Sequence, residues 1–229
     1  MINPNMKNNH LKSATYDLKF LLNRGYRKKG ALNFVSNKYL LNKDERNYLF
    51  RKTFSDSKSI SRQLKIIPVD AICGKNVFID GYNVLITSEI IINHDYGSIV
   101  MCDDGVLRDV KSIFGKYHMD KCTKKVIVSV LNLINKYQPN CVNLLFDRPV
   151  SKSGELVKLT NSILEDKGIN GSAETQSNVD YELIKRSKLF CGVVATSDGV
   201  IMDRVHSVLD IPYWLCKEQD GIKNLKNKK

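Results

Sequence analysis

Four aspartates stand at places in the chain from which their side chains could share one pocket. In chain order they are Asp80, Asp147, Asp180 and Asp198. Three of them follow short apolar runs, and Asp180 lies at the start of a helical pattern. Carboxylates in one pocket repel each other, so they need protons or cations to be stable together. Hard oxygen ligands suit Mg²⁺ or Mn²⁺, which can activate water for attack on a phosphate. The spacing therefore indicates a metal site for phosphodiester hydrolysis.

Each of these aspartates also has a purely structural interpretation. Residues 80–83, Asp-Gly-Tyr-Asn, are typical of a strand-to-loop turn. Asp180 could complement a helix dipole, and Ser197 or Asp198 could be the N-cap of the next helix. Asp147 could belong to a turn with a local ion pair. The joint occurrence of an acid after three strands and at one helix start nevertheless favours a metal site.

Strands and helices that could position these acids alternate from Asn76 onward. The expected strands are residues 77–79, 99–101, 142–146, 193–195 and 211–215, and the expected helices are 120–137, 155–167, 178–188 and 199–207. Residues 84–92 are rich in β-branched side chains and fit a strand or a helix. This alternation predicts an α/β fold with a parallel sheet covered on both faces. Ligands bind beyond the carboxyl ends of such strands, where the acids would lie.

The first 65 residues differ from the rest in charge and in pattern. They hold 15 Lys and Arg against 4 Asp and Glu, a net charge of +11, whereas residues 66–229 hold 21 and 20. A helical pattern runs from Ser13 to a cap at Gly25, and Asn42 with Glu45 indicates another helix start. Residues 55–65 fit a linker or a last short helix. We expect a small basic all-α domain at 1–65 and an α/β domain at 66–229.

This localised positive charge is typical of a protein that binds a polyanion. The alternative is a solubilising surface rich in Lys and Asn. Arg148 and Lys152, which follow Asp147, could hold a phosphate or could belong to a solvated loop. The candidate nucleic-acid-binding side chains are Arg24, Arg27, Lys28, Lys29, Arg148 and Lys152.

Four segments resemble, in the same order, the motifs of the PIN-like nuclease superfamily, especially its NYN type. They are Val77–Val84, Leu144–Asp147, Asn178–Ile184 and Val194–Gly199. The resemblance covers about residues 76–215 and implies a Rossmann-like three-layer fold with RNA cleavage that depends on Mg²⁺ or Mn²⁺.

The same resemblance implies roles for individual residues. Asp80, Asp147, Asp180 and Asp198 would be the metal ligands and the catalytic residues. Asn83 would support the first aspartate, and Thr196 or Ser197 would orient the last. Asp203 is a weaker supporting candidate. The front block, including residues 21–26, resembles the front domain of a set of uncharacterised archaeal proteins, which implies no activity.

We therefore expect a metal-dependent nuclease, an endoribonuclease that acts on single-stranded or structured RNA. The alternative is an RNA-binding protein without catalysis that has a degenerate PIN-like pocket. A phosphatase for small substrates would lack the Gly-rich phosphate loop and would leave the basic front domain without a role. We expect a cytoplasmic protein without a membrane partner, because no apolar run reaches roughly 18 residues. A homodimer stays open.

Overall fold

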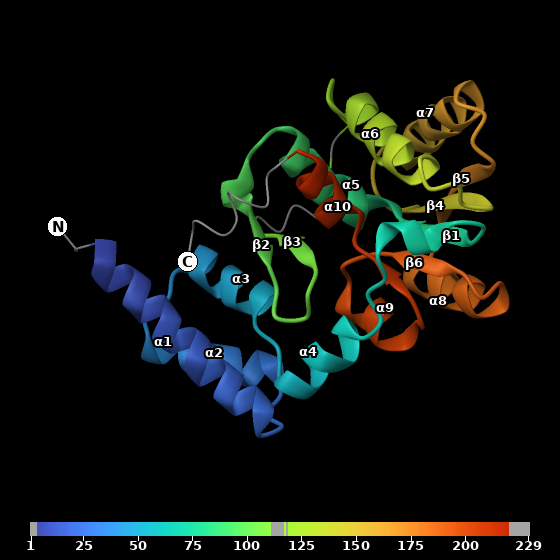
Figure 1. Ribbon diagram of the computed structural model, residues 1–229. Coiled ribbons are helices and arrows are strands. Elements are labelled where there is room, and N and C mark those ends of the chain that lie inside the picture. The colour runs from blue at the N-terminus through green and yellow to red at the C-terminus, as the bar shows by residue number, and fades with distance from the viewer. Residues whose placement is uncertain (1–3, 111–116, 118, 220–229) are drawn as a thin grey trace.

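The computed structural model describes residues 4–110, 117 and 119–219, with side chains described from His10 onward. The chain forms a helical N-terminal part followed by an α/β part, as the sequence predicts (Figure 1). The helices of the N-terminal part are α1 (Pro4–Asn23), α2 (Lys28–Lys38), α3 (Lys43–Lys52) and α4 (Asp56–Gln63). The short 3-10 helix η1 (Val69–Ile72) leads from this part into the sheet.

The α/β part is built on a parallel sheet with the strand order β5-β4-β1-β6-β7. Its strands are β1 (Asn76–Asp80), β4 (Cys141–Asp147), β5 (Gly171–Gln176), β6 (Val193–Ala195) and β7 (Val208–Leu209). Its helices are α5 (Gly81–Ile92), α6 (Thr123–Asn135), α7 (Ser153–Asp166), α8 (Val179–Leu189), α9 (Gly199–Arg204) and α10 (Ile211–Glu218). An antiparallel pair, β2 (Ile99–Met101) and β3 (Leu107–Asp109), follows the 3-10 helix η2 (Tyr96–Ser98).

Helices cover both faces of the sheet, because side chains alternate along each buried strand. Val77 and Ile79 of β1 pack into the larger core with α5, α6, α7 and α10. Phe78, between them, packs into a second core with α8 and α9 on the opposite face. The N-terminal helices have a core of their own, centred on Leu18 and Leu49. The predicted three layers, helices on either side of a parallel sheet, are confirmed (Figure 1).

Two helix ends in the N-terminal part have the caps that their sequences predict. Gly25 has a φ of +84°, which an L side chain rarely adopts, and Tyr26 N donates to Leu21 O at 3.2 Å beyond the end of α1. Asn42 Oδ1 accepts from Glu45 N at 2.9 Å, and Glu45 Oε2 accepts from Asn42 N at 2.8 Å. This reciprocal pair is a capping box that begins α3.

The structure corrects some of the expected elements and decides one that the sequence left open. Residues 211–215 form helix α10, with Pro212 in its first turn and Asp210 as its N-cap, so the last strand is β7. Residues 84–92 belong to helix α5, whose side chains are nearly all buried; burial on all sides removes the amphipathic pattern that identifies most helices. Strand β5 is polar and was not expected, and α1 begins at Pro4 rather than Ser13.

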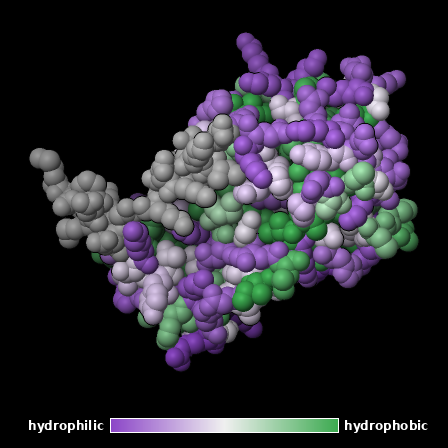
Figure 2. All heavy atoms as spheres, in the orientation of Figure 1, coloured by the Kyte–Doolittle hydropathy of each residue, from purple (hydrophilic) through white to green (hydrophobic). Residues whose placement is uncertain are grey.

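The antiparallel pair β2–β3 connects the two parts of the molecule, and it lies beside α3 in Figure 1. Asp103 N, in the turn of this pair, donates to Lys52 O at the end of α3 at 2.9 Å. Leu107 N donates to the buried Asp210 carboxylate at 2.7 Å. The face in Figure 2 is largely hydrophilic, with hydrophobic residues in separate patches. Among the described residues, none of the helices combines the length and the apolar character needed to cross a bilayer.

Candidate active site

The order of the strands gathers three of the predicted acidic positions at one edge of the sheet. Asp80 is the last residue of β1, which lies between β4 and β6. Asp147 is the last residue of β4, and Asp198 follows β6 by three residues. Asp180 lies in the first turn of α8, which follows β5. Since neighbouring strands lie about 4.8 Å apart, the three strand ends fall within about 10 Å of each other.

Asp80 is the most deeply buried of these acids, with 6% of its surface exposed. Its Oδ2 accepts a hydrogen bond from Thr196 Oγ1 at 2.7 Å. Burial raises the pKa of Asp80 to about 7, although the bond from Thr196 acts in the opposite direction. The charges of Asp198, Asp147 and Asp180 contribute to this rise, so these three carboxylates lie within electrostatic reach of Asp80.

The carboxylates around Asp80 also disfavour each other's ionisation. Burial raises the pKa of Asp147, and the charge of Asp180 adds to this effect. Burial likewise raises the pKa of Asp180, with a further contribution from Asp198 and an opposing one from Arg204. None of the ion pairs between described side chains includes any of the four aspartates. Among the described residues, no cationic side chain is therefore in direct contact with the four carboxylates.

Of the supporting residues, Thr196 contacts the last aspartate, as the family resemblance implied, whereas Asn83 has a different partner from the one expected. Asn83 does not bond to the first aspartate: its Oδ1 accepts from Ser197 N at 2.8 Å and from Ser197 Oγ at 2.9 Å. Thr196 Oγ1 bonds to Asp80 and also accepts from Asp198 N at 3.0 Å. The start of α5 and the end of β6 are thus held together by side-chain bonds around the acids.

Local structure explains why two of the motif residues stand where they do. A Cβ on Gly81 would overlap the Phe146 ring and would lie 2.8 Å from the Leu145 carbonyl oxygen, so only glycine lets α5 begin this close to β4. Asp198 is the N-cap of α9, since its Oδ1 accepts from Val200 N at 2.6 Å. The structural interpretation of Asp198 therefore holds, and its second oxygen accepts no hydrogen bond from a described residue.

The donor set at this edge fits a hard cation in chemistry, since it consists of carboxylate oxygens around a buried acid. The side chains do not form a ready coordination shell: among the described residues, no three His, Cys, Asp or Glu lie together as they would around a metal ion. Mutual repulsion keeps like charges apart when no cation lies between them. A bound ion would therefore require the carboxylates to turn toward one another.

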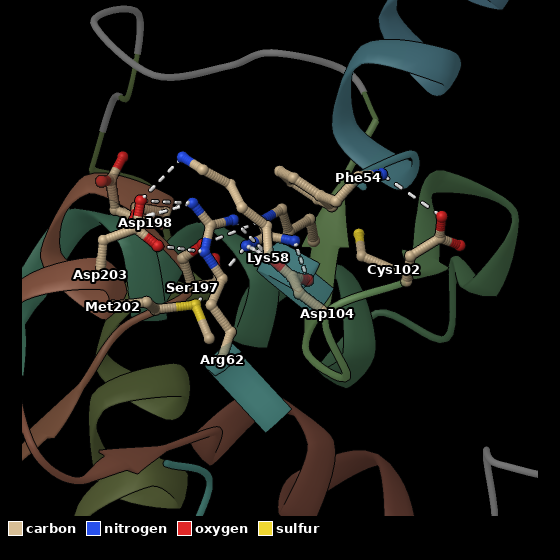
Figure 3. Close-up of polar contacts among 12 residues, drawn as sticks. Phe54, Lys58, Arg62, Cys102, Asp104, Ser197, Asp198, Met202 and Asp203 are labelled. Carbon is tan, nitrogen blue, oxygen red and sulfur yellow. Dashed lines mark hydrogen bonds and ion pairs between the residues drawn. The ribbon is translucent and has the colours of Figure 1, made fainter. Parts of the chain in front are cut away.

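Asp203, the weaker supporting candidate, lies in α9 and is bound to α4 instead. Its Oδ1 accepts from Arg62 Nε at 2.7 Å, and its Oδ2 accepts from Lys58 Nζ at 3.0 Å. Figure 3 shows the Arg62 guanidinium between the carboxylates of Asp203 and Asp104. We therefore assign Asp203 to the junction between the N-terminal helices and the α/β part.

A buried network that the sequence does not reveal fixes the segment after β6. Asp104 is fully buried and accepts from Arg108 Nη1 at 2.6 Å and from Arg62 Nη1 at 2.7 Å. Arg108 Nε donates to Ser197 O at 2.8 Å, and Arg62 Nη2 donates to Gly199 O at 2.9 Å. The two arginines thus hold the backbone on either side of Asp198.

The predicted basic residues fall into two groups around the acids. Arg27, Lys28 and Lys29 line a cleft of about 890 Å³ that also includes Asp198. Arg24 packs over the Phe20 ring and does not line this cleft. Arg148 and Lys152 are exposed in the loop after β4, on the other side of Asp80 from Asp198. Another cavity, of about 530 Å³, lies at the opposite end of β1 beside Asn76.

Comparisons with known proteins match almost the whole chain but supply no activity. Residues 69–214 match the family described as Domain of unknown function (DUF5616), and residues 10–65 match Protein of unknown function (DUF434). The uncharacterized protein MJ0935 of Methanocaldococcus jannaschii is 37% identical over 203 residues, which cover 88% of this chain and 94% of that protein. No solved structure matches the chain. The expected likeness to uncharacterised archaeal proteins is thus confirmed, and the chain belongs to the DUF5616 family, with a DUF434 region in front.

Proposed function

We propose that the protein is an endoribonuclease: it depends on Mg²⁺ or Mn²⁺ and cleaves RNA at internal phosphodiester bonds. The observation that carries the proposal is Asp80, a buried carboxyl group at the end of the central strand with three aspartates within electrostatic reach. A group whose charge is disfavoured in this way is typical of a functional site. The likeness of four segments to PIN-like nucleases, argued above from the residues alone, supports the same reaction.

The chain's own residues divide the work at this site. Asp80, Asp147, Asp180 and Asp198 would hold the ion, and Thr196 keeps the Asp80 carboxylate in place through its 2.7 Å hydrogen bond. A bound divalent ion would lower the pKa of a water molecule and stabilise the charge that develops on the phosphate. Arg148 and Lys152, exposed beside Asp147, can bind the backbone of the substrate.

A second function, RNA binding without cleavage, is favoured by one specific observation. As described above, the carboxylates do not already surround a common point, so the pocket could be one that no longer holds an ion. The basic cleft beside Asp198 would serve binding in either case. The two functions differ in one measurable property, which is cleavage of RNA in the presence of a divalent ion.

Cleavage of a labelled RNA by the purified protein tests the proposal. We expect shorter products in Mg²⁺ or Mn²⁺ and none in chelator. Asp80→Asn and Asp180→Asn should each lower the rate by at least about 10–100-fold, the range seen when even a residue that supports a metal ligand is replaced. Asp166→Asn, an exposed acid at the end of α7, is the matched control and should keep the wild-type rate. An Asp80→Asn protein that cleaves as fast as the wild type would sink the assignment, and binding without cleavage in any divalent ion would favour the second function.

A further inference from the structure

The cleft beside Asp198 lies between the N-terminal helices and the segment that follows β6. Its N-terminal wall comes from the turn between α1 and α2 and from α3 and α4, and includes Tyr26, Arg27, Lys28, Lys29, Phe50, Phe54 and Lys58. Its other wall is formed by residues 197–200 and Asp203. Because Asp198 belongs both to this wall and to the acidic edge of the sheet, the cleft opens directly beside the candidate active site.

The base of the cleft carries more positive than negative charge. Lys28 Nζ lies 3.5 Å from the centroid of the Phe54 ring, and Arg62 Cζ lies 4.7 Å from the same centroid. Asp104 and Asp203 are bound by the arginines and by Lys58, so neither forms an ion pair with Lys28. Burial, together with the charges of Arg108 and Arg62, lowers the pKa of Lys28 to about 7, although Asp104 acts in the opposite direction. Among the described side chains, Lys28 therefore has no ion-pair partner, and a bound anion would favour its charged form.

The rim adds free cations. Arg27 and Lys29 are exposed, and no ion pair between described side chains includes either of them. Together with Lys28 they form a short run of positive charge at the start of α2. A ligand with phosphate groups at intervals would satisfy both the rim and the base, whereas one small anion would satisfy a single position.

Aromatic side chains stand among these cations. Tyr26 is 60% exposed and Phe50 is 48% exposed, although contact between such large rings and water is unfavourable. Unpaired bases stack on exposed aromatic rings in this way, and the arrangement accepts any base because each has a π-face. The bases of a duplex already stack on each other and are not free to do so.

The volume of the cleft fits a short stretch of single-stranded nucleic acid better than a duplex. A volume of about 890 Å³ falls within the range of about 300–1,000 Å³ that small ligands occupy, so it can hold only a few nucleotides. Proteins that recognise double-stranded RNA contact far more, about 16 base pairs. A bound RNA strand that leaves the cleft at Asp198 would pass Asp80 and then Asp147, since the β-strands β6, β1 and β4 are neighbours in that order.

We propose that this cleft binds an unpaired stretch of a polynucleotide and directs it to the aspartates. Arg27, Lys28 and Lys29 bind its phosphates, while Tyr26 and Phe50 stack on its bases. That the cleft binds RNA is inferred from its own side chains, whereas the path of the RNA to the aspartates rests on the proposed nuclease function. The N-terminal helices therefore select single strands rather than only supporting the α/β part.

Binding of a fluorescent 12-nucleotide unpaired RNA tests this inference without catalysis. The full-length Asp80→Asn protein in chelator is titrated against this RNA and against a duplex of the same sequence. We expect the single strand to bind at least about tenfold more tightly. Replacing Arg27 and Lys29 by Gln should weaken binding about tenfold and should reduce the slope of log K against log salt by about 1.4. Replacing Tyr26 and Phe50 by Ala should also weaken binding about tenfold, with little change in that slope.

Matched variants outside the cleft control for charge and for exposed rings. Lys124→Gln with Lys125→Gln removes two exposed charges from α6, and Phe34→Ala removes a ring that is 66% exposed on α2. Both should bind as the parent protein does. The inference is overturned if these controls weaken binding as much as the cleft variants, if the duplex binds equally well, or if poly-glutamate displaces the RNA as well as unlabelled RNA does.

The outcomes also separate this inference from the proposed nuclease function. If the cleft binds single-stranded RNA but the wild-type protein cleaves no RNA in Mn²⁺ or Mg²⁺, the inference about the cleft is supported and the proposed nuclease function is contradicted. If the protein cleaves RNA and the variants of the cleft cleave it at the same rate, the nuclease function is supported and the cleft does not bind the substrate. These variants replace Arg27, Lys29, Tyr26 and Phe50.

Discussion

At the scale of single residues, the charge of Asp80 works against the stability of the protein. Its pKa is raised from 3.8 to about 7 in the folded chain. Between these pH values the folded state binds more protons than the unfolded state, so the free energy of unfolding falls as the pH rises from about 4 to about 7 and then levels off. We expect Asp80→Asn to raise the melting temperature at pH 8 by at least about 3 °C in chelator, because the amide has no charge to bury.

The pH dependence of this stabilisation identifies its cause. At pH 5 Asp80 is protonated in the folded protein but is still mostly ionised in the unfolded chain, so the advantage of Asp80→Asn should be clearly smaller than at pH 8 and should vanish only near pH 3.8. Thermal unfolding of both proteins at pH 5 and pH 8 in chelator measures the difference, and the exposed Asp166→Asn serves as the control. A variant that is less stable than the wild type at both pH values would show that Asp80 contributes structure rather than unbalanced charge.

A divalent ion should reverse this effect in the wild-type protein. Binding to the folded state alone stabilises by about 2.7 kcal/mol when the free ion is at 100 times its dissociation constant. We expect Mn²⁺ to raise the melting temperature of the wild-type protein by several degrees and that of Asp80→Asn by much less. Ca²⁺, which prefers more ligands at longer distances, is a useful comparison. An equal shift in both proteins would place the ion elsewhere.

At the scale of elements, the turn between β1 and α5 determines how closely the helix approaches the sheet. A Cβ at Gly81 would overlap the Phe146 ring, which lies in the larger core and cannot move freely. We expect Gly81→Ala to lower the free energy of unfolding by about 1–3 kcal/mol, as other overpacked sites do. Gly154→Ala in α7 is the control, because no atom lies within 4 Å of its added Cβ and alanine favours a helix. Urea denaturation compares the two, and equal stabilities would contradict the close approach.

The fold could be predicted from the sequence wherever one physical pattern dominated. Apolar runs such as residues 77–79 and 142–146 identified the central strands, and Asn42 with Glu45 marked the start of α3. The pattern failed where burial or polarity removed the contrast between the faces of an element. Helix α5 is buried nearly all round, and β5, the outermost strand next to β4, is polar. Neither therefore shows the alternation of apolar and polar residues that identifies a helix or a strand.

For the candidate site, the sequence predicts positions better than partners. The carboxyl ends of parallel strands meet at one edge, which suffices to place Asp80, Asp147 and Asp198 near each other. The hydrogen bonds of Thr196 and Asn83 depend on side-chain directions that no spacing encodes. The cleft also needs contacts between segments over a hundred residues apart, such as Arg62 with Gly199, so it cannot be read from local pattern.

At the scale of the whole molecule, one buried carboxylate joins the two parts. Asp104, in the turn between β2 and β3, binds Arg62 of α4 (Figure 3). It also binds Arg108 of β3. These arginines in turn bind the carbonyl oxygens on either side of Asp198. The N-terminal helices and the acidic edge are therefore coupled through a network of buried side chains.

Because of this coupling, we expect Asp104→Asn to destabilise the entire chain rather than only the N-terminal helices. Removing the carboxylate leaves two buried arginines with too little negative charge, which costs about 3–5 kcal/mol in comparable cases. Asp17→Asn is the matched control, since the pair that Asp17 forms with Lys38 lies at the surface and is worth about 1 kcal/mol or less. Calorimetry should show one transition that shifts downward as a whole for Asp104→Asn. An early transition of the helices alone, with the α/β part unchanged, would show that the two parts fold independently and that the cleft between them is not fixed by Asp104.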